Sequence, residues 1–453
     1  MKRVLIKGGR IIDSRQQLDR TANVLIEEGR IAAITEDVPA ADQMIDARGL
    51  IVSPGFVDLH MHEDPFDEKK GAPGQDIARS MVLMGVTTCM GGNCGENYFP
   101  PDRYLDHMDQ HGNCVNMGLF VGHTYVRNTC GGKDKYAPVR GETLERMEQL
   151  TADLLAKGCM GVSFGVKYVP GTSWEEIIRL SRLCSPDDRL VTAHVRKDVS
   201  GVFEAVEEMA KIAREAGVRV QVSHVGSMGG YGQMKALLED LDRYRREGVD
   251  MCCDCYPYDA FSTTIGATTY DEGFLDEYRA GYDSVQLVDG RYAGMRCTKE
   301  IFDWARANEP WAKTIGYFMK PEDIVLALNH PCVMLASDGL RSGAKGHPRA
   351  AGAFPRFICE YVKTGKISLT EALRKMTDMP AERLKLPKKG NLCVGSDADI
   401  TVFDYDTLQD RATYEDPSLP PDGIAYVLIN GQIAADHGRL VNDKLGRAVR
   451  FGQ

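Results

Sequence analysis

Ser53-Pro54-Gly55-Phe56-Val57-Asp58-Leu59-His60-Met61-His62 joins a short apolar run to a pair of histidines near the start of this 453-residue chain. The run from Gly55 to Leu59 predicts a buried β-strand. Because His60 and His62 are separated by one apolar residue, an extended backbone places both imidazoles on the same face. Two imidazole nitrogens on one face suit zinc or a similar ion, so this stretch predicts part of a metal site.

Similar apolar runs recur along the middle of the chain. Amphipathic segments such as 201–216 and 232–247 lie between them and predict helices. Eight strand–helix units in succession predict an α/β fold, a (β/α)8 TIM-type barrel, over residues 53–388. The eighth strand comes late, after a polar, Gly-containing stretch that we interpret as an insertion near the barrel mouth at about 262–330. The eight candidate strands begin at residues 55, 86, 117, 161, 190, 219, 250 and 333.

The two ends of the chain share a different sequence pattern. Residues 1–52 contain short β-rich runs divided by tight Gly turns, and residues 389–453 repeat this pattern. The run from 424 to 433 contains Asn430-Gly431 and predicts a hairpin with an Asn-Gly turn. We therefore expect a small β-sandwich domain assembled from both termini.

The composition narrows the classes of partner. Hydrophobic residues make up 43% of the chain and charged residues 26%, as in an ordinary globular protein. A formal net charge of −10 argues against nucleic acid and against an anionic membrane surface as partners. No apolar run is long enough to span a bilayer. The 13 cysteines have no framework spacing, which favours a cytoplasmic location with free thiols. Nothing in the sequence indicates an oligomeric state.

Residues that can bind a metal or transfer a proton follow several of the predicted strands. They are His60 and His62 after the first strand, Cys94 after the second, His194 after the fifth, His224 after the sixth and Asp338 after the eighth. Taken alone, Cys94 could be a buried small hydrophobe and Asp338 a helix cap. In a barrel, however, all carboxyl ends of the strands lie on one face, so these side chains should converge. Zinc held by three protein ligands activates a water molecule, and a carboxylate such as Asp338 can carry its proton.

The sequence resembles the amidohydrolase superfamily and, within it, the D-aminoacylase (N-acyl-D-amino-acid deacylase) group. The likeness covers nearly the whole chain and implies a barrel with a flanking β-sandwich. The matching motifs are Ser53–His62, Gly92-Asn93-Cys94-Gly95, Ala193-His194-Val195-Arg196, Gln221-Val222-Ser223-His224, Asp254-Cys255-Tyr256-Pro257-Tyr258, Ser337-Asp338-Gly339 and His347-Pro348-Arg349.

The resemblance also implies roles for individual residues. Cys94 would be a metal ligand where relatives often use a carboxylated lysine, and His194 and His224 would complete the tighter zinc position. His60, His62 and Asp338 would line a second, more weakly filled divalent-metal position, with Asp338 as general base and acid. Arg349 resembles the arginine that clamps the substrate α-carboxylate, a role that suits a bidentate guanidinium. Tyr168 would donate a hydrogen bond to the substrate.

One departure from the group concerns the cations near the pocket. Members commonly have His-His-Lys after the sixth strand, whereas this chain has His224-Val225-Gly226. Lys167 lies just past the fourth strand, where other branches carry their carboxylated lysine. Three readings of Lys167 stay open: a carbamate that bridges two metals, a replacement cation that binds the substrate, or a solvated side chain.

These features give competing functional hypotheses for a small-molecule carboxylate or amide substrate. The first is a metal-dependent amidohydrolase that cleaves the amide bond of an N-acyl-D-amino acid. The second is a cyclic amide hydrolase of the hydantoinase or dihydroorotase type, motivated by the missing lysine and by Lys167. The third is a non-catalytic structural relative, which the full set of expected ligands argues against. A deaminase is a further possibility within the superfamily, but the D-aminoacylase-like motifs disfavour it.

Overall fold

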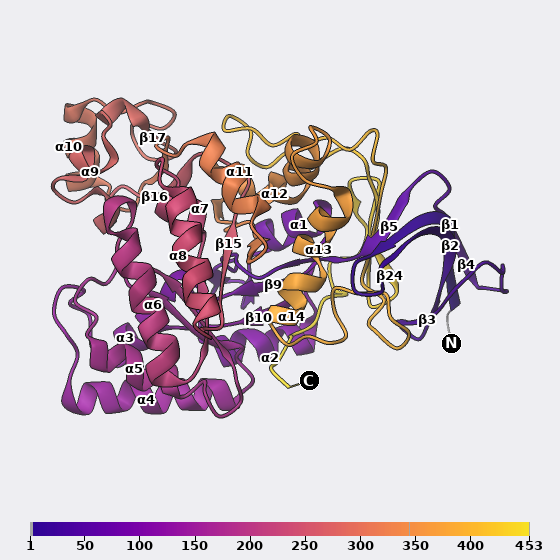
Figure 1. The fold of residues 1–453 in the computed structure, drawn as a ribbon, viewed down its shortest axis with the longest axis horizontal. Helices are drawn as coiled ribbons and strands as arrows, with labels where there is room; N and C mark the ends of the chain where they lie inside the picture. Colours follow the sequence, from indigo (N-terminus) through magenta and orange to yellow (C-terminus); the bar gives the residue numbers. More distant parts are fainter. Residues whose placement is uncertain (1–2, 344, 453) are drawn as a thin grey trace.

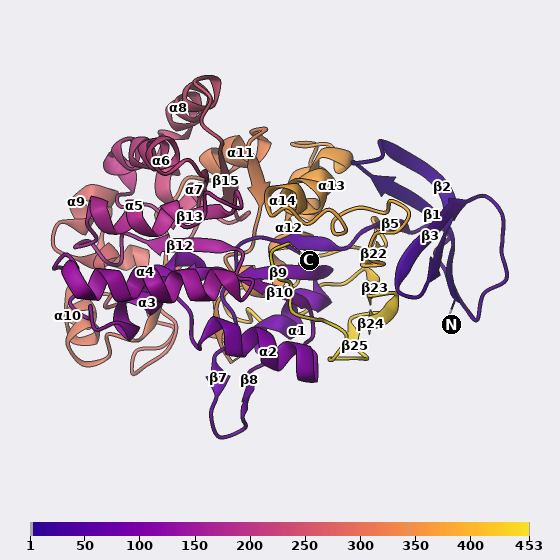
Figure 2. The ribbon, with the colours of Figure 1, turned by 90° about the horizontal axis from the view of Figure 1, so that it is seen from below.

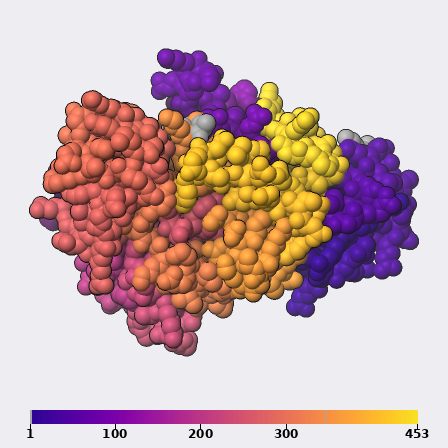
Figure 3. Space-filling model, turned by 90° about the horizontal axis from the view of Figure 1, so that it is seen from above, coloured from indigo at the N-terminus to yellow at the C-terminus, as the bar shows by residue number. Residues whose placement is uncertain are grey.

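The computed structural model describes residues 3–343 and 345–452 (Figure 1). A sheet built from both ends of the chain lies at one end of the elongated molecule, and a lobe formed by residues 261–318 lies at the other. Parallel strands and helices occupy the middle. Among the residues described, no helix has both the length and the apolar character needed to cross a membrane. Figure 3 shows the lobe and the N-terminal strands at opposite ends of the surface.

Both ends of the chain contribute to one nine-stranded sheet. Its order is β25-β24-β23-β22-β5-β1-β2-β3, with β4 paired to β1. Strands from the two ends pair directly, because β5 is parallel to β1 and antiparallel to β22. The sheet has its own hydrophobic cluster, which includes Val24, Val52 and Ile400. The strands are β1 (Arg3–Asp13), β2 (Leu18–Glu27), β3 (Arg30–Thr35), β4 (Gln43–Asp46), β5 (Ile51–Pro54), β22 (Ile400–Phe403), β23 (Ile424–Ile429), β24 (Gln432–Asp436) and β25 (Arg439–Leu440).

The turn between β23 and β24 confirms the predicted hairpin. Ile429 pairs with Gln432, which leaves Asn430 and Gly431 as the two turn residues. Both have positive φ, 50° at Asn430 and 73° at Gly431. Asn and Gly tolerate this left-handed conformation, which matches the twist of a two-residue hairpin.

The middle of the chain forms two parallel sheets, with the orders β10-β9-β6 and β11-β12-β13-β14-β15-β19. Every neighbouring pair in them is parallel. Each of the eight predicted strands is present, and the third is divided at Phe120 into β10 and β11. The strands are β6 (Phe56–Asp58), β9 (Val86–Gly91), β10 (Asn116–Leu119), β11 (Val121–Gly122), β12 (Gly161–Gly165), β13 (Leu190–His194), β14 (Arg219–Val222), β15 (Met251–Cys255) and β19 (Val333–Leu335).

Amphipathic helices cover the parallel strands. In α6 (Val202–Ala216) the residues Val202, Val206, Met209 and Ala213 are buried, a spacing of three and four that places them on one face. The predicted helices at 201–216 and 232–247 correspond to α6 and α8 (Met234–Arg246). The other helices of this region are α1 (Asp76–Leu83), α2 (Pro101–His111), α3 (His123–Thr129), α4 (Gly141–Ala156), α5 (Trp174–Arg182), α7 (Val225–Gly229), α11 (Pro321–Asn329), α12 (Arg349–Phe357), α13 (Leu369–Met376) and α14 (Asp378–Arg383).

The segments that follow the first and the last parallel strand lie side by side. Asp338 N–H donates to the carbonyl of His60 at 2.7 Å, and His62 N–H donates to the carbonyl of Gly339 at 3.0 Å. A parallel β-bridge joins Met61 to Gly339 between them. After His62 the chain turns outward into a projecting hairpin, β7 (Phe66–Asp67) and β8 (Ala72–Pro73), visible in Figure 2.

The stretch before the eighth strand forms a separate lobe. Its three-stranded antiparallel sheet has the order β16-β18-β17, and a separate hydrophobic cluster includes Phe261, Tyr270 and Phe302. Since Phe261 and Tyr278 also line the pocket described below, the lobe forms one wall of it. Its elements are β16 (Phe261–Thr264), α9 (Phe274–Tyr278), β17 (Val285–Leu287), α10 (Lys299–Asn308) and β18 (Lys313–Gly316).

Candidate active site

The carboxyl ends of the parallel strands gather the predicted metal ligands into two overlapping groups. One consists of Cys94, His194 and His224, and the other of His60, His62, Cys94 and Asp338. Within each group the candidate ligand atoms lie within 4.8 Å of one another, and every residue is buried. Cys94 belongs to both groups. The structure therefore places all six residues at one site, with the thiol between the two groups.

The Cys94 sulfur lies close to three imidazoles. Its Sγ is 3.4 Å from His224 Nε2, 3.5 Å from His60 Nε2 and 3.9 Å from His194 Nδ1. Burial alone would raise the pKa of this thiol, but the facing His224 and His60 outweigh it and hold the pKa of Cys94 well below its usual range. The side chain is thus suited to the thiolate form, which is the form that binds metals.

Asp338 joins the second group to a cation. Its Oδ1 lies 3.1 Å from His62 Nε2 and 3.5 Å from His60 Nε2, and its Oδ2 lies 2.9 Å from Arg349 Nη1. Burial would raise the pKa of the carboxyl, but the Arg349 charge, together with the hydrogen bond from His62, keeps the pKa of Asp338 well below its usual range. Asp338 is therefore ionised, as a base must be.

Three of the candidate ligands have an unusual backbone conformation. The φ angle is 52° at Cys94, 35° at His224 and 49° at Asp338. Residues with a side chain rarely adopt this left-handed region, and each instance costs free energy that the surrounding structure must supply. Such strain is concentrated at functional sites. Its occurrence at three separate strand ends indicates that the backbone is shaped to present these side chains.

Asp254 supports the site, although we assigned it no role from the sequence. It is the penultimate residue of β15 and accepts hydrogen bonds from His60 Nδ1 at 3.0 Å and from the backbone N–H of His224 at 2.7 Å. Gln221 Nε2 donates to its other oxygen. A carboxylate behind a histidine fixes the ring orientation and the tautomer. The sequence could have indicated this role, because Asp254 begins the Asp254–Tyr258 motif near the end of a predicted strand. On the other side, Ser227 Oγ lies 2.9 Å from His224 Nδ1.

Replacing Asp254 with Ala should weaken metal binding, because the His60 ring and the backbone N–H of His224 both lose their acceptor. We expect the affinity for zinc to fall by about 10- to 100-fold. Competition of the purified protein with a chromophoric chelator measures this affinity directly. Asp254→Asn keeps one acceptor oxygen and should lose less. Equal affinity in the Ala variant and the native protein would mean that Asp254 does not orient the site.

The predicted substrate residues have different positions relative to the ligands. Arg349 begins α12, is 2% exposed and lines the pocket. Tyr168 also lines it, with its ring centroid 4.5 Å from that of His194. Lys167 does not belong to the lining. Its Nζ lies 2.5 Å from Asp198 Oδ1, and its side chain is only 12% exposed, so the reading of Lys167 as a solvated residue is wrong.

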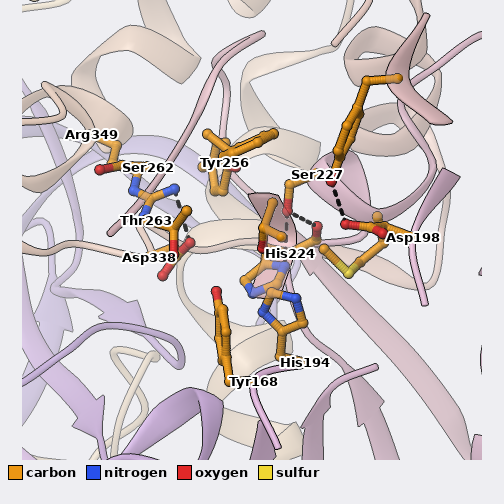
Figure 4. Close-up of a pocket in the computed structure, with 14 residues that line it drawn as sticks. Tyr168, His194, Asp198, His224, Ser227, Tyr256, Ser262, Thr263, Asp338 and Arg349 are labelled. Carbon is orange, nitrogen blue, oxygen red and sulfur yellow. Dashed lines mark hydrogen bonds and ion pairs between the residues drawn. The ribbon is translucent and has the colours of Figure 1, made fainter. Parts of the chain in front are cut away.

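These residues surround a cavity (Figure 4). Arg349 and Asp338 lie at one end of it, and Asp198 lies at the other. The imidazoles of His194 and His224 lie between these ends, with Tyr168 on one side and Tyr256 on the other. A small molecule in the cavity would therefore contact the two histidines and a carboxylate at once.

Comparisons with known proteins agree with this arrangement. The model of the amidohydrolase family matches residues 191–435. An N-acyl-D-glutamate deacylase of Alcaligenes xylosoxydans xylosoxydans is 32% identical, covering 94% of this chain and 92% of its own length. A D-aminoacylase of the same organism is 31% identical, covering 98% of this chain and 97% of its own length. Dihydroorotases and a hydantoinase match more distantly.

A solved structure matches the whole chain. The N-acyl-D-glutamate deacylase of Bordetella bronchiseptica, in a complex with zinc and a phosphonate that mimics the tetrahedral intermediate, superimposes with a TM-score of 0.88. It is 30% identical and covers 99% of both chains. The chain belongs to the amidohydrolase family, and within it to the group of the D-aminoacylases and N-acyl-D-amino-acid deacylases.

Proposed function

We propose that the protein is a metal-dependent hydrolase that cleaves the amide bond of an N-acyl-D-amino acid. The observation that carries this proposal is the buried cluster of a thiol, imidazoles and Asp338 in one cavity with Arg349. The relatives that match the chain along almost their whole length are deacylases of this substrate class. A non-catalytic role does not fit, because every predicted ligand is present and brought together.

We further propose that the two parallel sheets form one closed (β/α)8 barrel, supported by the bonds that join the segments after the first and last strands. The terminal sheet would be a β-sandwich domain of residues 1–52 and 389–453, folded over its own hydrophobic cluster. Residues 53–388 would form the hydrolase barrel, with an insertion at about 262–330.

The donor set fits zinc, because a thiolate and imidazoles are its preferred ligands. Cys94, His194 and His224 would hold one ion tightly, and His60, His62 and Asp338, beside Cys94, would offer a second position for a divalent metal. When bound, zinc lowers the pKa of water toward about 7 and polarises a carbonyl group. The named N-acyl-D-glutamate deacylase structure contains zinc, which supports this choice.

Side chains of the protein would bind the substrate and transfer the proton. Arg349 is buried and its Nη1 pairs with Asp338, but its Nε lacks a hydrogen-bond partner, so the guanidinium can also bind the substrate carboxylate. Tyr168 would donate its hydroxyl to the substrate. Asp338 would accept the proton of the attacking water and deliver it to the departing amine, as a general base and then a general acid. Tyr168 and Tyr256 flank the cavity and would limit the access of bulk water.

The cyclic amide alternative loses its main support. It rested on Lys167 as a carbamate or as a substitute cation, but its ammonium pairs with Asp198 and Cys94 lies between the ligand groups instead. The functional test is a panel of N-acyl-D-amino acids, their L-enantiomers and cyclic amides, offered to zinc-loaded protein. Release of free D-amino acid supports the proposal, and ring opening without deacylation contradicts it.

Arg349→Ala should affect both substrate binding and the pH profile. We expect KM for N-acyl-D-amino acids to rise by about 10- to 100-fold, the worth of a charged hydrogen bond. The pKa of Asp338 should also rise, since the cation that lowers it is gone. The acidic limb of the kcat profile should therefore move to higher pH. Steady-state kinetics across pH measures both effects, and an unchanged KM would place the carboxylate clamp elsewhere.

A further inference from the structure

The two ends of the cavity differ in charge. At one end Arg349 carries a permanent positive charge, and it is the sole lysine or arginine among the described residues that line the cavity. At the other end lies Asp198, in contact with the hydroxyl of Tyr278. Two carboxylates therefore face the same small cavity, Asp338 near Arg349 and Asp198 at the far end, and both side chains are at least nine-tenths buried.

Asp198 is fixed in place by its partners. Lys167 Nζ lies 2.5 Å from Oδ1, and the hydroxyl of Tyr278 donates to Oδ2 at 2.5 Å. The following residue, Val199, has a φ of 50°, which a β-branched residue rarely adopts. Gln233 Nε2 donates to the carbonyl of Val199 and holds this turn. The structure thus stabilises a carboxylate at this end of the cavity.

The ammonium of Lys167 is already paired with the Asp198 carboxylate. Lys167 stands behind Asp198 and does not line the cavity, so it offers no free ammonium to a ligand. Apart from the two histidines, Asp198, Asp338 and Arg349, the described residues that line the cavity are neutral. Among them are Ser227, Met228, Thr269 and Tyr278. A second substrate carboxylate here would be buried next to a like charge without a cation of its own, which is strongly unfavourable.

We infer that the cavity accepts substrates with a single carboxylate, and that Asp198 excludes those with two. This inference rests on the proposed deacylase function and narrows it. The substrates are N-acyl-D-amino acids in which both the side chain and the acyl group are uncharged, with their one carboxylate at Arg349. Such selectivity is obtained by a repulsive element rather than by an added contact.

The experiment compares three substrates on the zinc-loaded enzyme. N-acetyl-D-methionine has one carboxylate, N-acetyl-D-glutamate has a second on the side chain, and N-succinyl-D-methionine has a second on the acyl group. We expect kcat/KM for the first to exceed that for each of the others by at least about ten-fold. In Asp198→Asn the freed Lys167 ammonium should raise kcat/KM for at least one of the two dianions by about 10- to 100-fold.

Two further variants keep the result interpretable. Lys197 and Glu204 form an exposed pair of the same type, at 2.9 Å, outside the cavity lining. Glu204→Gln makes the same change in net charge and should leave the substrate ratios unchanged. Lys167→Met leaves Asp198 without its cation and should lower the dianion ratios further, which tests the idea even if Asp198→Asn folds poorly.

The outcomes separate the two proposals. Turnover of either dianion as fast as the monoanion by the native enzyme overturns the inference but leaves the deacylase function standing. Ratios that do not change in Asp198→Asn and Lys167→Met overturn the role of Asp198. Failure to hydrolyse any of the three substrates, with metal bound, contradicts the proposed function itself.

Discussion

Replacing Cys94 with Ala is expected to abolish the tight metal site and, with it, hydrolysis. Cys94 is the residue that the two ligand groups share, and its sulfur lies within 4 Å of three histidine nitrogens. The variant keeps imidazoles but no thiolate, the strongest zinc donor in the set. Metal content after dialysis against a weak chelator should fall from about one equivalent to near zero, and turnover should fall to the background rate.

Cys89 offers a matched control for this variant. It is also buried, it lies on the strand that leads to Cys94, and burial raises the pKa of its thiol well above the usual value. Cys89→Ala should therefore keep the metal and the activity, apart from a loss of stability of about 1 kcal/mol typical of a core change. Retention of one tightly bound zinc by Cys94→Ala would show that the thiol is not a ligand.

Replacing Asp338 with Asn is expected to separate catalysis from metal binding. Asn has nearly the same shape but cannot carry a proton, so kcat should drop by about 10²- to 10⁴-fold. The tight metal should remain, because Cys94, His194 and His224 are untouched. Metal analysis and single-turnover kinetics on the same preparation measure both quantities.

Two results would argue against this role of Asp338. Near-normal turnover in Asp338→Asn would mean that another group carries the proton. Loss of the metal together with activity would instead make Asp338 chiefly a ligand. Asp67→Asn serves as a control, because Asp67 is a partly exposed carboxylate at the end of β7 that accepts from the backbone N–H groups of the β7–β8 turn, and its replacement should leave kinetics unchanged.

Much of the ligand cluster could be predicted from the sequence, for a geometric reason. His60, His194, His224 and Asp338 each follow a run that reads as a buried strand, and parallel strands present their carboxyl ends on one face. Cys94 follows the same rule, through the strand at Val86–Gly91. Periodicity and position along the chain are local properties, so the sequence displays them directly.

The contacts that hold the side chains around the ligand cluster could not be predicted in this way. The contact of Asp254 with His60 spans 194 positions, and that of Tyr278 with Asp198 spans 80. The pairing of Lys167 with Asp198 depends on how a loop after one strand meets a loop after the next. Such contacts follow from tertiary packing, which leaves no local pattern at either residue.

Both proposals require a metal ion among Cys94, His194 and His224. Anomalous diffraction from zinc-loaded crystals, measured above and below the zinc edge, tests it directly. We predict a strong anomalous peak about 2.3 Å from the Cys94 sulfur and about 2.0–2.1 Å from the nitrogens of His194 and His224. Absence of a peak there, with zinc bound at another place or not at all, would contradict the account.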